Sequence, residues 1–345
     1  MNAVRLDTSA HHYYAAGSNK SRLLWLLLLA TILVLASGLS IGLGTRAVSL
    51  AEILNALNGH RETMGEAAVA LRIPRTLLAI IAGAALGLAG CVMQGITRNP
   101  LADPGILGVN MGAALAMVIA IAWFNIGSTY APIWVAIGGA GAAATLFISW
   151  ARWVGGATPL KLALAGAATS VAFSSLVVAI ILPRADLAGS IRAGRSAAWR
   201  RHFRSDRPCI AVSGVWAGDQ SIECPKTEFT RIGRGTCSGL GENVAFARLC
   251  AAIGAIFLCG ATTAICGPIG FVGLVVPHLC RLLIGVDHRW LLPFSAITGA
   301  VLLVTSDIIG RVIARPTEID VGIITAFLGA PFFIYIVRRQ RVREL

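Results

Sequence analysis

The sequence predicts an all-α, polytopic transmembrane helical bundle, and three observations lead to this fold class. Hydrophobic residues make up 56% of the 345 residues and charged residues only 13%, which a soluble domain with a polar surface could not sustain. Uncharged runs of about 20 residues, the length at which a helix crosses a bilayer, recur along the chain. These runs are rich in Leu, Ala and Gly without polar–apolar alternation, so they predict helices and not barrel strands.

Nine clear spans can be placed, against about ten in the family considered below. They are 23–43, 75–95, 105–125, 132–151, 159–182, 246–266, 269–285, 290–313 and 321–337. The first run is longer than the apolar region of a signal peptide and lacks a small-residue cleavage site, so we interpret it as a retained helix.

Basic residues predict the orientation of the bundle. Arg5, Lys20 and Arg22 precede the first span, and "RRQRVREL" follows the last. The positive-inside rule therefore places both termini in the cytoplasm. The chain divides into a cytoplasmic N-terminal tail at 1–22, a transmembrane domain at 23–337 and a basic cytoplasmic tail at 338–345. Two cytoplasmic termini require an even number of spans, so one crossing is missing from the nine.

The missing crossing falls in an anomalous stretch, residues 192–237. Six arginines occur within the nineteen residues from Ile191 to Cys209, and each would cost roughly 2.5 to 3.5 kcal/mol at the centre of a bilayer. The apolar run nearby, "CIAVSGVWAG", is too short to span. Two explanations stay open: a shifted reading frame or sequencing error, and a divergent basic loop that touches anionic lipid.

Small residues and a turn predict how the spans pack. "AGAALGLAG" at 82–90, "GGAGAAA" at 138–144 and "AGAATS" at 165–170 would let helix backbones approach closely. The Asn, Pro, Asp and Gly residues of 99–105 predict a tight turn that joins two close antiparallel spans.

Polar residues inside the spans are costly in lipid and should face the bundle interior or a water-filled path. Asn110, His278, Asp307 and Thr325 are of this kind. Hydrogen bonds between helices, with no role in transport, explain them equally well. Asp307 is followed one turn later by Arg311, which favours a structural ion pair over a proton- or sodium-coupling carboxylate. An ion-coupled secondary transporter is therefore a remote alternative.

Three longer stretches are more specific. They contain "RIPR" and "NPLADPGILG" (72–116), "GPIGFVGLVVPH" and "DHR" (267–293), and "TAFLGAP" (306–339). As a set these motifs closely resemble the FecCD family of ABC importer permeases, which are BtuC-like and carry iron siderophores, haem or cobalamin. The resemblance covers most of 20–190 and 238–345.

The resemblance implies a permease subunit of the bacterial plasma membrane, with iron(III)-siderophore as the most common cargo and haem or cobalamin as alternatives. It implies a second permease subunit in a homo- or heterodimer, an extracytoplasmic substrate-binding protein and two ATP-binding cassette ATPase subunits as partners. A non-functional frameshifted copy is a further alternative.

The resemblance also assigns residues. Arg72, Arg75 and Arg311 would lie at the outer face and meet glutamates of the binding protein, although interfacial snorkelling is the alternative. Asn110, Thr325 and Gly329 are candidates for the translocation path. Gly239, Leu240 and Gly241, within "SGLGENVAFAR", are what remains of the ATPase-coupling segment.

Other activities find little support in the sequence. The glycine spacing of "GCVMQGIT" lacks the Lys of a phosphate-binding loop, so ATP hydrolysis is expected on a separate subunit and no enzyme activity on this chain. "GLSIG" at 38–42 matches the G-x-S-x-G pattern of hydrolases but closes a membrane helix instead of following a strand. Eight scattered cysteines predict no metal and no cofactor. The formal charge of +13 predicts contact with membrane lipid and not with nucleic acid.

Overall fold

The computed structural model describes residues 19–97, 99–100, 102–105, 108–124, 131–153, 159–184, 244–285 and 287–339. The helices in this part of the chain are α1 (Asn19–Gly42), α2 (Leu50–Leu57), α3 (Met64–Thr97), α4 (Val109–Phe124), α5 (Ala131–Trp153), α6 (Pro159–Ile181), α11 (Val244–Cys266), α12 (Val272–Ile284), α13 (His288–Ile313) and α14 (Val321–Arg339). No strand occurs in these ranges, and the all-α fold class is confirmed. By length and composition, 6 of the helices in the described residues could cross a membrane, while α4, α12 and α14 contain shorter apolar stretches.

Each predicted span coincides with a helix, but the start of α3 differs. α3 begins at Met64, eleven residues before the predicted start at 75, because Arg72, Pro74 and Arg75 interrupt the apolar run without ending the helix. Proline is tolerated inside membrane helices where neighbouring groups satisfy the freed backbone. At 1.5 Å per residue α3 is about 51 Å long, roughly 20 Å more than the hydrocarbon core of a bilayer. One end of α3 therefore extends beyond the membrane.

α2 is a short helix that the hydropathy pattern did not predict. A capping box starts it: the Ser49 side chain accepts from the Glu52 amide at 3.3 Å, and the Glu52 carboxylate accepts from the Ser49 amide at 2.8 Å. The hydrogen bonds that the Ser49 amide and the Ser49 hydroxyl donate to the Glu52 carboxylate lower the pKa of Glu52. α2 packs on the first turn of α3, where a Cβ added to Gly65 would overlap the Glu52 carboxylate.

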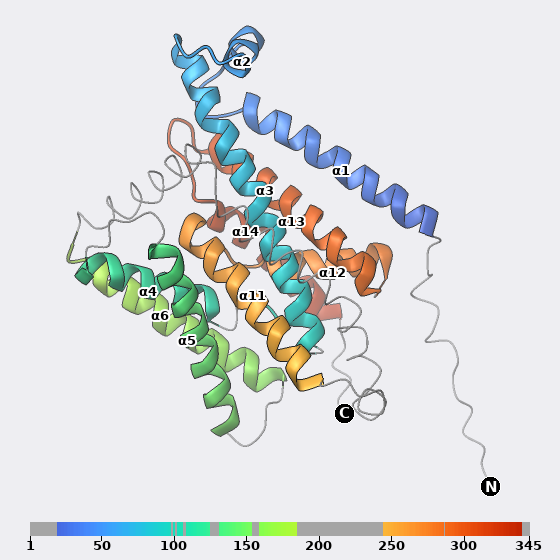
Figure 1. The fold of residues 1–345 in the computed structure, drawn as a ribbon, viewed down its shortest axis with the longest axis vertical. Coiled ribbons are helices and arrows are strands. Elements are labelled where there is room, and N and C mark those ends of the chain that lie inside the picture. Colours follow the sequence, from blue (N-terminus) through green and yellow to red (C-terminus); the bar gives the residue numbers. More distant parts are fainter. Residues whose placement is uncertain are drawn as a thin grey trace.

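α3 lies at the centre of the bundle (Figure 1). It packs against α13, α12 and α11, while α1 lies along α13. α4, α5 and α6 form a second group that reaches α3 through α11. The prediction that the turn at 99–105 joins close antiparallel neighbours is wrong, because α3 and α4 do not pack along each other and α11 lies between them (Figure 1).

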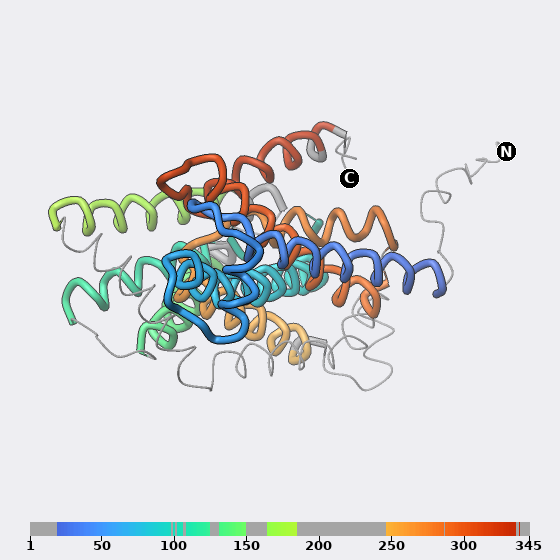
Figure 2. Tube along the Cα trace, turned by 90° about the horizontal axis from the view of Figure 1, so that it is seen from above, coloured from blue at the N-terminus to red at the C-terminus, as the bar shows by residue number. Residues whose placement is uncertain are grey.

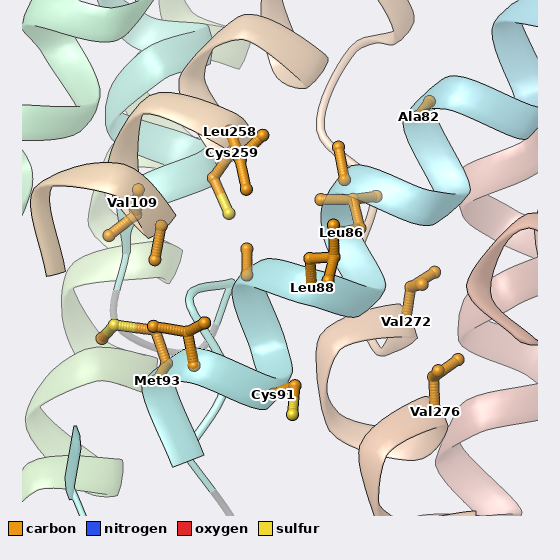
Figure 3. Packing of buried hydrophobic residues seen from close by; sticks show 14 of the residues in the cluster. Ala82, Leu86, Leu88, Cys91, Met93, Val109, Leu258, Cys259, Val272 and Val276 are labelled. Carbon is orange, nitrogen blue, oxygen red and sulfur yellow. The ribbon is translucent and has the colours of Figure 1, made fainter. Parts of the chain in front are cut away.

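Glycine-mediated contacts set the packing of α3. A Cβ on Gly83 would overlap the Gly299 carbonyl of α13, and a Cβ on Gly90 would overlap Gly273 of α12. Between α4 and α5, a Cβ on Gly112 would overlap the side chain of Ala143. The predicted close packing of the small-residue segments 82–90 and 138–144 is confirmed. Figure 3 shows the hydrophobic core of the bundle, with labelled side chains from α3, α4, α11 and α12.

The bundle has two ends, which we call the α2 end and the Arg22 end. At the α2 end lie the C-terminus of α1, the start of α3 and the C-terminus of α13 (Figures 1 and 2). At the Arg22 end, Arg22 of α1 pairs with Asp287, just before α13, at 3.2 Å.

α6 and α11 run in the same general direction through the bundle (Figure 1). The connecting residues 185–243, which include the anomalous stretch 192–237, lie outside the described residues.

The close approach of α3 to α12 predicts a matched pair of glycine variants. Gly90→Val places a branched side chain against Gly273, whereas Gly141→Val on α5 meets no atom within 4 Å at its Cβ. We expect Gly90→Val to destabilise the bundle by about 1 to 3 kcal/mol through overpacking and Gly141→Val to change stability little. Thermal unfolding of the detergent-purified protein measures both. Equal melting temperatures for the two variants would contradict the close packing.

Candidate functional site

The three predicted docking arginines gather at the α2 end, around Asp307. Arg72 and Arg75 lie three residues apart on one face of α3, and Asp307 and Arg311 lie four apart on α13. The crossing of Gly83 with Gly299 fixes how these faces meet. Arg75 and Asp307 each lie eight residues from that crossing, and because the helices are antiparallel they reach the same level. We call Arg72, Arg75 and Arg311 the arginine cluster.

Arg72 is turned into the protein, where its side chain binds backbone carbonyls. Nη1 donates to the carbonyls of Ile41 at 3.1 Å and Gly42 at 2.9 Å, and Nη2 donates to that of Arg46 at 2.6 Å. The residue is 7% exposed. Gly44 makes room for it, since a Cβ there would overlap the guanidinium. Arg72 thus binds the C-terminal end of α1.

Arg311 binds the same helix end from α13 and is 2% exposed. Nη1 donates to the Ser40 carbonyl at 3.1 Å and Nη2 to the Ser40 hydroxyl at 2.6 Å. Nη2 also forms an ion pair with Asp307 Oδ2 at 2.9 Å. The geometry of this contact is not that of a hydrogen bond. The ion pair predicted between Asp307 and Arg311 is present.

Together Arg72 and Arg311 satisfy the last turn of α1. The final four carbonyls of a helix lack partners inside the helix and carry the negative end of its dipole. Here they belong to Leu39, Ser40, Ile41 and Gly42. The first accepts from the Leu43 amide at 2.7 Å, and the arginines occupy the other three. We call Arg72 and Arg311 the α1 clamp.

Arg75 differs from the α1 clamp because it reaches the surface. Its Nε donates to Asp307 Oδ1 at 2.9 Å, and its Nη1 donates to Glu318 Oε2 at 2.6 Å. The side chains of Arg75 and Glu318 are 35% and 42% exposed, whereas that of Asp307 is 2% exposed. The docking role of the arginine cluster stays a prediction, for which Arg75 is the accessible member.

The three path candidates lie around the break between α11 and α12, residues 267–271. Asn110 is buried and donates to the Ile269 carbonyl at 2.8 Å. On α14, a Cβ added to Gly329 would overlap Phe271, and Thr325 donates to the Gly322 carbonyl one turn earlier at 3.0 Å. The structure therefore places Asn110 of α4 and Gly329 of α14 against this break, in which Gly267 and Ile269 are buried and Pro268 is exposed.

The break itself has unusual backbone conformations. Phe271 has a φ of 69° and Gly267 a φ of 84°. A large non-glycine residue in the left-handed region is strained and persists only where its surroundings hold it. Gln94, which sequence reasoning did not single out, binds the neighbouring turn by donating to the Gly273 and Leu274 carbonyls at 3.1 and 3.3 Å. In the sequence, Gln94 could have been found as an amide side chain inside an otherwise apolar run.

The coupling residues Gly239, Leu240 and Gly241 lie outside the described residues. Within the described part of the chain, no three His, Cys, Asp or Glu side chains are grouped as a metal site would require.

The α1 clamp predicts a second pair of glycine variants. Gly44→Ala should displace the Arg72 guanidinium and leave α1 carbonyls without donors, whereas Gly38→Ala on the same helix meets no atom within 4 Å. We expect Gly44→Ala to destabilise by about 1 to 3 kcal/mol, the cost of buried polar groups left unpaired. Gly38→Ala should be neutral or stabilising, because Ala favours helix by up to about 1 kcal/mol. Melting temperatures compare the two, and a neutral Gly44→Ala would argue against the clamp.

The chain is similar to known transport proteins along most of its length. The FecCD transport family matches residues 29–339. The ferric enterobactin transport system permease protein FepD of Escherichia coli is 37% identical over 317 residues, covering 90% of this chain and 94% of the relative. The Fe(3+)-citrate import system permease protein YfmD of Bacillus subtilis is 36% identical over 333 residues, covering 96% and 99%.

A solved structure shares the fold. A metal-chelate type ABC transporter in an inward-facing conformation superposes with a TM-score of 0.73 at 27% identity, covering 92% of this chain and 99% of the other. The motifs, the helical bundle and these matches over nearly the whole chain agree. The chain belongs to the FecCD transport family, the multi-pass permease subunits of ABC importers.

Proposed function

We propose that this chain is the permease subunit of an iron(III)-siderophore importer of the bacterial plasma membrane. The observation that carries the proposal is the match to two iron-chelate permeases over at least 90% of this chain. The break at 267–271, contacted by Asn110 and Gly329 with Thr325 one turn away on α14, supports a translocation path at the meeting of α4, α11, α12 and α14. Haem or cobalamin is the alternative cargo, because the chelate is selected mainly by the binding protein.

The proposed assembly has four kinds of component. A second permease subunit, identical or related, completes the path, and two ATPase subunits act at the cytoplasmic side, where Gly239, Leu240 and Gly241 couple to them. The Arg22 end faces the cytoplasm together with both termini, as the positive-inside rule favours. The α2 end then faces outward and receives the extracytoplasmic binding protein.

The arginine cluster is the proposed docking point for that protein. Arg75 makes the direct contact, because its guanidinium is partly exposed and already oriented by Asp307. The α1 clamp supports this contact from below by fixing α1 against α3 and α13. Charge pairing of this kind steers and orients a partner more than it adds affinity.

Uptake assays test the function. In a strain that lacks its own chelate permeases, we expect this chain, together with a cognate ATPase and binding protein, to import labelled ferric siderophore faster than labelled cobalamin or haem. Uptake should require ATP hydrolysis. Transport by the purified chain alone, driven by an ion gradient, would contradict the proposal. Uptake that appears only after residues 192–237 are replaced by the corresponding segment of FepD would support the non-functional, frameshifted alternative.

Docking is tested with two arginines at the same end. Arg75→Gln removes the accessible guanidinium of the cluster, and Arg61→Gln removes an equal charge from an exposed residue between α2 and α3. We expect Arg75→Gln to weaken docking of the binding protein about ten-fold and Arg61→Gln to weaken it much less. Affinity is measured on the permease–ATPase complex in nanodiscs. Equal effects would assign docking to overall charge and remove Arg75 from the site.

A further inference from the structure

The ion pair between Arg75 and Glu318 has features of an exchangeable contact. Arg75 Nη1 lies 2.6 Å from Glu318 Oε2, and both side chains are more than a third exposed. The opposite side of the same guanidinium is fixed, because Nε and Nη2 lie 2.9 and 2.8 Å from the buried Asp307 Oδ1. Arg75 therefore has one permanent partner and one at the solvent boundary.

Glu318 reaches Arg75 from the turn between α13 and α14. The backbone of this turn is tied to α13, since the Ile319 amide donates to the Gly310 carbonyl at 3.2 Å and a Cβ on Gly310 would lie 2.8 Å from the Ile319 carbonyl oxygen. Thr317 closes the turn by donating to the Ala314 carbonyl at 2.7 Å. The Glu318 side chain can thus leave Arg75 without any change in the backbone that carries it.

The net charge of the arginine cluster and its two carboxylates favours binding of a further acidic group. Three guanidiniums, of Arg72, Arg75 and Arg311, share two carboxylates, of Asp307 and Glu318, so one positive charge remains in excess. Arg72 is bound only to carbonyls in the contacts that define the α1 clamp. A further carboxylate would meet the attraction of the whole cluster, and Arg75 Nη1 is where it could bind from solvent.

We propose that Glu318 is an internal stand-in for the carboxylate of the docking partner. In the free permease it occupies Arg75 Nη1 and keeps the guanidinium oriented; when the binding protein docks, an acidic side chain of that protein displaces it. This inference rests on the proposed function. Exposed ion pairs contribute little net stability, so the exchange is easy. Docking then breaks one ion pair for each one it makes, which moderates its affinity and its dependence on salt.

The test compares two glutamates at the α2 end. Glu318→Gln removes the competitor, and Glu62→Gln makes the same change of charge at an exposed residue just before α3. The probe is the purified cognate siderophore-binding protein, titrated onto the permease–ATPase complex in nanodiscs. We expect Glu318→Gln to tighten docking about two- to five-fold, the range of an exposed ion pair, and to steepen the loss of affinity with salt. Glu62→Gln should change both much less.

The outcomes separate this inference from the function beneath it. If the wild-type complex binds no binding protein, the importer proposal fails and the inference fails with it. If the wild-type complex binds and the two glutamate variants behave alike, the inference alone is overturned. In an Arg75→Gln background the effect of Glu318→Gln should vanish; persistence of the effect would show that Glu318 acts through another group and would also overturn it.

Discussion

The last carbonyls of α1 have no donors within their own helix, and their need for hydrogen-bond partners determines the arrangement of the α2 end. Three of them bind guanidinium groups of Arg72 and Arg311, and those side chains come from two other helices. Leaving such carbonyls unpaired in a protein interior would cost about 1 to 3 kcal/mol each. The clamp exists only because α3 and α13 cross at Gly83 and Gly299, where a side chain on either helix would hold them apart. Small residues in mid-bundle thus determine which polar groups meet at its end.

The same constraint explains arginines where membrane statistics disfavour them. On the proposed orientation the arginine cluster lies at the outer end of the bundle, opposite to the preference for cytoplasmic basic residues. The resemblance suggested glutamates of a partner as the compensation. The structure supplies an internal compensation first. Arg72 binds carbonyls at the end of α1 and just beyond it, Arg311 binds a carbonyl of α1 and Asp307, and Arg75 binds Asp307 and Glu318. A docking partner can then contact only the accessible side of the Arg75 guanidinium.

Hydropathy and motifs predicted most of the helices, and the errors have physical causes. α2 was missed because eight amphipathic residues are too few to give a membrane-spanning signal. The start of α3 was misplaced because Arg72, Pro74 and Arg75 interrupt the apolar run at a point where the helix itself continues. The pairing of α3 with α4 failed because chain adjacency does not determine which helix inserts between two others. The partners of the arginines depend on side-chain directions across three helices, which a single sequence does not encode locally.

Asp307 connects the rigid and the exchangeable parts of this end. Its Oδ1 binds Arg75 and its Oδ2 lies 2.9 Å from Arg311 Nη2, with almost no access to solvent. Because charges in a buried site are weakly screened, exchange of the carboxylate at Arg75 Nη1 changes the field at Arg311, and Arg311 binds the end of α1. An event at Glu318 on the surface therefore reaches the α1 clamp through one shared carboxylate. Electrostatics alone provides this connection, without movement of α3 or α13 along each other, which their glycine-mediated contact resists.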